Sequence, residues 1–141
     1  MKMMLALRPP VERRRGVATV EFALAAPILF LLLFGIFEIA HAFMVQHQIK
    51  DAARQGCRVG VCPYKFNADV TATVDTALSK AGITGASTTI LVNDAAGDVG
   101  TALAGDEISV RITLTAADVS LYPGGGFILE QLSAVYSLRH Q

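Results

Sequence analysis

Charge is scarce in most of this chain and is absent from one long stretch of it. No ionisable residue occurs among the sixteen positions between Glu21 and Glu38. Phe22–Ala42, which extends this run to 21 residues, matches the roughly 20 residues needed to cross about 30 Å of hydrocarbon. The gap in charge therefore predicts a segment that enters a membrane.

Basic residues are few outside the N-terminus. Residues 1–16 hold five bases and one acid, a net charge of +4, so the remaining chain carries a net charge of −4 within an overall charge of zero. No basic patch of useful size is left outside this leader, which excludes a nucleic-acid-binding surface. The triple arginine Arg13–Arg15 beside the apolar run indicates that this end stays in the cytoplasm.

Recognisable catalytic and metal-binding patterns are also missing. Gly124–Gly126 lacks the lysine and the following helix of a phosphate-binding loop. His41 and His47 would lie about 240° apart on a helix, so they do not form a metal-binding face. The acids of residues 93–106 lack EF-hand spacing, and no nucleophile lies in a pattern with a base. We predict no enzyme activity, no cofactor and no metal.

Only two cysteines occur, Cys57 and Cys62, and both follow the apolar run. With the arginines inside, that side is periplasmic or extracellular, where disulfides persist. A bridge needs Cα atoms within about 7 Å, which five residues along a straight helix exceed. Pairing therefore predicts a helix that ends near Gly56, and the alternative is two buried free thiols.

Helical periodicity continues beyond the apolar run. The apolar positions Val45, Ile49, Ala52 and Ala53 share one face, and no helix breaker appears before Gly56. A helix from about Val17 to Gln55 would be about 60 Å long. We predict a leader at 1–16, a transmembrane helix with its extension at 17–56 and a small head at 57–141.

The head has a mixed pattern. A short helix after residue 66, opened by Asn67 or Asp69 and closed by Gly82, presents its apolar residues on one face. Beyond it the apolar period becomes two, which is typical of strands with one wet face. The predicted strands are 88–92, 107–115 and 132–139. The expected fold is α+β, with the long helix packed on a small antiparallel sheet of about three strands and one short helix.

Glu21 opens the apolar run and is its most unusual residue. It suits an ordinary signal anchor, because the helix dipole stabilises an acid at a helix N-terminus. A cleavable signal peptide is the second interpretation, because Ala40-His41-Ala42 satisfies the small-x-small rule and predicts a secreted domain that starts at Phe43.

A third interpretation uses every residue of the stretch. Arg13–Gly16 followed by Glu21 resembles the cleavage site of type IV prepilins, which a membrane peptidase cuts after the glycine on the cytoplasmic face. The cut would fall between Gly16 and Val17. Glycine suits that position because it lets an extended chain approach catalytic carboxylates closely. Glu21 would then be the fifth residue of the mature chain, as in that family.

The resemblance is narrower than prepilins in general. Gly16–Leu24, then Pro27, then Phe34–Glu38, then the sequence AARQGCR at 52–58, is similar to the TadE-like pseudopilins of tight-adherence (Flp) pilus systems. It implies a minor pilin-like protein of the bacterial inner membrane, with its N-terminus cytoplasmic and its head periplasmic. The partners implied are the prepilin peptidase, other pilins or pseudopilins and the pilus assembly platform.

Glu38 is the second acid at an edge of the apolar run. Seventeen residues from Glu21, it would face a direction about 100° away, so the two carboxylates do not form an acid pair. One interpretation is a solvated acid at the headgroup level. The other is an interhelical contact to a second pilin-like subunit.

Overall fold

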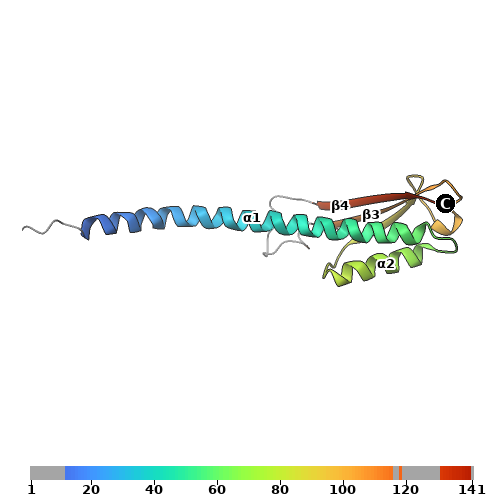
Figure 1. Ribbon diagram of the computed structural model, residues 1–141, viewed down its shortest axis with the longest axis horizontal. Helices are drawn as coiled ribbons and strands as arrows, with labels where there is room; N and C mark the ends of the chain where they lie inside the picture. Colours follow the sequence, from blue (N-terminus) through green and yellow to red (C-terminus); the bar gives the residue numbers. More distant parts are fainter. Residues whose placement is uncertain (1–11, 116–117, 119–130, 141) are drawn as a thin grey trace, which may run out of the picture. The chain divides into compact units, whose positions relative to one another are not determined.

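The computed structural model describes residues 12–115, 118 and 131–140. In chain order its elements are α1 (Glu12–Gly60), α2 (Asn67–Lys80), β1 (Ser87–Val92), β2 (Ala95–Ala96), η1 (Val99–Thr101), β3 (Glu107–Thr115) and β4 (Gln131–Arg139) (Figure 1). The predicted α+β class is confirmed, with one long helix, one short helix and an antiparallel sheet. Residues 1–11 of the predicted leader lie outside the described residues.

The chain divides into two compact units, residues 1–37 and residues 38–141. The first unit contains the N-terminal part of α1. The second unit, called the head from here on, contains the rest of α1 together with α2 and the sheet. The head therefore includes more than twenty helical residues that continue directly from the apolar run.

The part of α1 inside the head packs as its periodicity predicts. Val45, Ile49, Ala52 and Ala53 are all buried, with exposed fractions of 5% or less. They join a core that α2 and the sheet complete with the apolar residues Val70, Val74, Leu78, Ile108, Val110, Ile112, Leu114, Leu132 and Ala134. Figure 1 shows β4 and α2 lying beside these last turns of α1.

The end of α1 differs from the prediction. The helix runs through Gly56 and ends at Gly60. A Cβ built on Gly56 would lie 2.6 Å from Cγ2 of Val74, and one on Gly60 would lie 3.2 Å from Cγ2 of Ile108. Both glycines therefore permit close packing of α1 against α2 and β3, and Gly56 does not break the helix.

The helix α2 was predicted to start at Asn67 or Asp69 and to end at Gly82. The Phe66 amide donates a hydrogen bond to the Asp69 carboxylate at 3.1 Å, which caps the first turn. Asn67 instead binds the loop after β2, accepting from the Val99 amide at 3.0 Å and donating to the Gly97 carbonyl at 2.9 Å. Gly82 ends the helix with a φ of +72°, as the sequence predicts.

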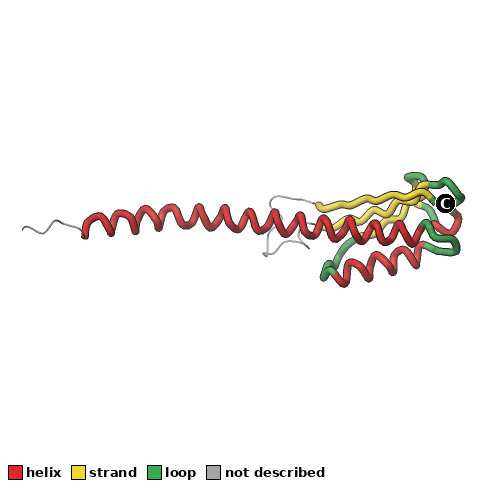
Figure 2. Tube along the Cα trace, viewed as in Figure 1, coloured by secondary structure: helices red, strands yellow, loops and turns green. Residues whose placement is uncertain are grey.

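The sheet has four strands in the order β2-β1-β3-β4, and every neighbouring pair is antiparallel. The predicted strand 107–115 matches β3, and its even-numbered residues face the core. Both described helices contribute core residues to this same face. Figure 2 shows green loops at the end of the head near the C-terminus, where β1 turns into β2 and where residues 97–106 lead into β3.

The fourth strand, β2, was not predicted. Asn93 and Asp94 adopt φ values of +51° and +63°, and Val92 pairs with Ala95 across them. Two consecutive residues with positive φ make the tight turn that suits a two-residue hairpin. This turn brings Ala95 and Ala96 back beside β1, where they form a strand of two residues. The small residues of this segment did not by themselves predict a strand.

Candidate assembly site on the N-terminal helix

The first unit presents its apolar side chains outward. Large side chains such as Phe22, Leu24 and Leu31 are about 70% exposed. In the described residues, α1 is the one helix long and apolar enough to cross a membrane, and none of its most apolar window is buried inside the protein. Because water disfavours such a surface, this segment suits contact with lipid or with other helices.

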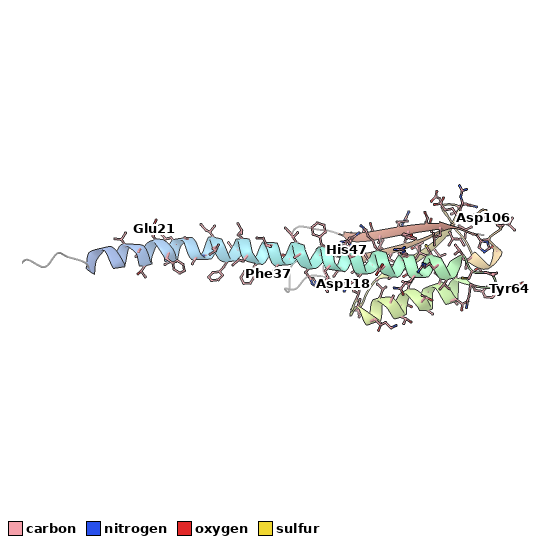
Figure 3. The ribbon with its side chains drawn as sticks, in the orientation of Figure 1. Glu21, Phe37, His47, Tyr64, Asp106 and Asp118 are labelled. Atoms are coloured by element: carbon pink, nitrogen blue, oxygen red, sulfur yellow. The ribbon has the colours of Figure 1, made fainter. Side chains whose placement is uncertain are left out.

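Glu21 lies on this exposed helix four residues after Val17 (Figure 3). Residues four apart on an α-helix are neighbours on one face. Within the described residues Glu21 has no ion pair or side-chain hydrogen bond. The carboxylate is therefore available to a group outside the described residues.

Gly16 and Val17 both lie within the first turns of α1, so the bond between them is helical here. A Cβ added at Gly16 would meet nothing within 4 Å. Packing inside this chain therefore gives no reason for glycine at that position.

Glu38 is placed in the head and is half-buried. The structure thus brings Gly16, Val17 and Glu21 together within two turns of helix, whereas Glu38 belongs to the other unit. The predicted contact of Glu38 with a second subunit stays a prediction.

The two cysteines are free thiols in this structure, Cys57 buried and Cys62 exposed. Cys57 is completely buried, and its Sγ donates to the Tyr136 carbonyl at 2.8 Å. Burial raises the pKa of the Cys57 thiol to about 11. The bridge considered from the sequence is not formed in this structure, because α1 continues through Cys57 and directs its thiol toward the sheet.

The acids of the loop before β3 serve local structure. Asp98 accepts a hydrogen bond from the Gly100 amide at 3.0 Å. Asp106 accepts from Asn93 at 2.9 Å and from the Leu103 amide at 2.7 Å. These two bonds lower the pKa of Asp106. No group of three potential metal ligands occurs in the part of the chain that the structure describes.

Sequence reasoning missed the side chains that join α1 to the edge of the sheet. Gln46 donates from Nε2 to the Ser133 carbonyl at 2.8 Å, and the guanidinium of Arg54 lies 5.9 Å from the centre of the Tyr136 ring. Their spacing on α1 placed them off the apolar face, which gave no indication of a partner. Finding them would have required knowing that the predicted last strand packs beside α1.

Comparison with known proteins gives one match. The family model described as TadE-like protein matches residues 16–58. No significant match was found among curated proteins or among solved structures. The matched segment begins at Gly16, contains Val17 and Glu21 and ends two residues before the end of α1.

Proposed function

Because residues 16–58 form a TadE-like segment, and the TadE-like family consists of pilus structural components, we propose that this chain is a minor pseudopilin of a tight-adherence pilus. A prepilin peptidase cuts it between Gly16 and Val17. The apolar part of α1 spans the inner membrane with its N-terminus in the cytoplasm. The head stands in the periplasm and acts by contact with other pilins or with the assembly platform.

The observation that carries the proposal is the placement of Glu21. It is an acid on an exposed apolar helix, one turn after the residue that cleavage would make the N-terminus. An unpaired charge inside a bilayer costs about 3 kcal/mol on insertion scales. The new amino group at Val17 is the nearest group of opposite charge that processing creates.

Assembly relieves this cost. In a bundle of such helices, Glu21 of one subunit pairs with the amine at Val17 of its neighbour. The pair forms only when the two helices have the correct axial offset, so the acid sets the register of assembly. Catalysis has no part in this role, which depends on packing and charge pairing alone.

The mature N-terminus, measured by mass spectrometry on protein from cells that contain the peptidase, tests the proposal. A start at Val17 supports it. A start at Met1 would indicate an unprocessed membrane anchor whose sheet binds a periplasmic ligand. A start at Phe43 would indicate a secreted domain. The core begins at Val45, so all three products retain the core of the head and the N-terminus distinguishes them.

A further inference from the structure

The edge strand β4 directs a row of backbone groups away from the sheet. Just beyond its end, the His140 amide donates to the Asp106 carbonyl at 2.8 Å and the His140 carbonyl accepts from Gly105 at 2.9 Å. Antiparallel ladders alternate between bonded and non-bonded pairs. The even-numbered residues of β4 are therefore bonded to β3, and the odd-numbered residues direct their N–H and C=O groups away from the sheet.

One of these outward groups is already used inside the head. The Ser133 carbonyl accepts the hydrogen bond from Gln46. The outward groups of Val135, Ser137 and Arg139 have no hydrogen bond among the described residues. The stretch 135–139 thus offers hydrogen bonds over about 13 Å of strand.

Two cations of α1 follow Gln46 at intervals of four residues, on the stripe of the helix that contacts this strand. Arg54 lies over the ring of Tyr136, which belongs to β4, and Lys50 precedes it by one helical turn. Both residues are exposed, and within the described residues the one ion pair is Lys65–Asp69, elsewhere in the head. Lys50 and Arg54 are therefore unpaired positive charges beside an unpaired edge.

The acids near this edge do not neutralise its positive charge. On α1, Asp51 follows Lys50 by about 100° around the helix, and so lies farther from the sheet. On the sheet, Glu107 lies opposite Arg139 in the register of β3 and β4. The local charge over 135–137 is thus positive, from Lys50 and Arg54 on the side that faces α1 and from exposed Arg111, which lies opposite Val135, on the other face of the sheet.

We propose that the β4 edge at 135–139 binds an extended acidic segment of a partner protein, which adds a fifth strand to the sheet. Lys50 and Arg54 are about 6 Å apart along α1, and alternate residues of a strand are about 6.7 Å apart. Carboxylates at alternate positions of the added strand therefore meet the two cations in turn. The residue between them lies on the opposite face of the sheet, beside Val135, which is 52% exposed.

The occupant is a different protein rather than a second copy. A second copy that brought its own β4 would also bring its own Lys50 and Arg54, so like charges would repel. Long free edges are a route to association that proteins often block with charged residues. Here the cations oppose self-association and favour an acidic partner. The inference rests on the folded head alone and does not depend on processing at Gly16.

The test uses the full chain in non-ionic detergent and a blocked, fluorescently labelled peptide of alternating glutamate and valine. Fluorescence anisotropy gives its affinity, and hydrogen exchange measured by NMR gives the protection of each β4 amide. The control peptides replace every glutamate by glutamine or by lysine. Lys50→Glu and Arg54→Glu are compared with the matched variant Lys80→Glu, at an exposed lysine on α2.

We expect the glutamate peptide to bind about tenfold more tightly than the glutamine peptide, and Arg54→Glu to remove that preference and favour the lysine peptide. Lys80→Glu should bind like the original chain. The amides of Val135, Ser137 and Arg139 should gain protection, whereas the even-numbered β4 amides should not change.

Four results would overturn the inference. The first two are equal binding of the glutamate and glutamine peptides and no binding of either. The third is binding without protection of the odd-numbered amides. The fourth is protection, in the absence of peptide, that rises with protein concentration. The last result would identify a second copy as the occupant. The variant Ser137→Pro removes one outward N–H and no ladder bond, so it should weaken peptide binding while circular dichroism shows an unchanged fold.

Discussion

The part of α1 in the first unit and the part in the head are alike in glycine content, but only the second is packed against other elements. Each contains two described glycines, Gly16 and Gly35 in the first unit and Gly56 and Gly60 in the head. A Cβ on either of the first two meets nothing within 4 Å, whereas one on either of the second two meets side chains of the core. Glycine in the head is explained by packing inside this chain, and glycine in the first unit is not.

This difference separates two kinds of constraint. The part of α1 inside the head is held by contacts with α2 and the sheet, so its residues are constrained by the stability of the fold. The first part has exposed apolar side chains and an acid without a partner in the described chain. Under the proposed function, its residues are constrained by molecules outside the chain, namely lipid, other helices and the prepilin peptidase.

The largest expected effect is on processing at the first glycine. Gly16→Leu should abolish cleavage, because the side chain would block the close approach of the peptidase to the bond before Val17. A Cβ at this position meets nothing within 4 Å among the described residues, so a packing defect would not explain the loss. Mass spectrometry of the N-terminus measures the outcome, and Gly35→Leu, at an equally open glycine, is the matched control. Normal cleavage of the Gly16 variant would contradict the proposed cut.

The next largest effect is on assembly. Glu21→Ala should leave cleavage after Gly16 largely intact but impair incorporation or pilus formation, since the pair with the neighbouring amine is lost. Glu21→Asp, which retains the charge, should restore part of the assembly. Electron microscopy of piliated cells, together with N-terminal mass spectrometry, separates the two steps. Normal piliation of the alanine variant would refute the register role of Glu21.

In the head the matching change acts on stability. In Gly56→Ala the new Cβ would lie 2.6 Å from Val74 Cγ2, so either the Val74 side chain must turn or α1 and α2 must move apart. Overpacking of this kind costs about 1–3 kcal/mol, and the better helix propensity of alanine offsets up to about 1 kcal/mol. Denaturant unfolding followed by circular dichroism should show a lower midpoint. Gly35→Ala should leave the midpoint of the head unchanged, and equal midpoints for both variants would remove the contrast between the two parts.

The same contrast explains what the sequence could and could not predict. Periodicity depends on which side of an element is buried, so it located β3 residue for residue and identified the buried face of α1 from Val45 to Ala53. Gly56 was misread as a helix end because its reason for being small is Val74, which lies eighteen residues away in sequence and touches it only after folding.

The remaining omissions have a similar cause. The hairpin at Asn93–Asp94 depends on two backbone conformations that many residue pairs do not adopt. The charges beside β4 depend on which strand becomes the edge, and a list of strands does not give their order. In the first unit, by contrast, the candidate site of Gly16, Val17 and Glu21 is defined by spacing along one segment, so the sequence alone sufficed to propose it, and it stays a prediction.

A smaller expected effect within the head is the difference in maleimide reactivity between the two thiols. Cys62 is exposed and should react with a maleimide at neutral pH in the native protein, whereas Cys57 should react only after unfolding. The raised pKa of Cys57, about 11 against an ordinary value of 9.0, lowers its thiolate fraction about a hundredfold. Labelling followed by mass spectrometry measures both sites, and Cys62→Ser identifies the signal of Cys57. Absence of labelling at both sites after unfolding without reductant would instead demonstrate the bridge.

The smallest effect concerns the loop that Asp106 holds. Hydrogen bonds from Asn93 and from the Leu103 amide lower the pKa of this carboxyl, so folding favours its charged form. The stabilisation is therefore present above the ordinary aspartate pKa and is lost as the pH falls through the lowered value in the folded state. Hydrogen exchange at Leu103 should accelerate, relative to the intrinsic rate, when the protein is acidified across that range. Asp106→Asn should flatten this pH dependence while the core amides of β3 keep their protection, and an unchanged profile in that variant would show that another group controls the loop.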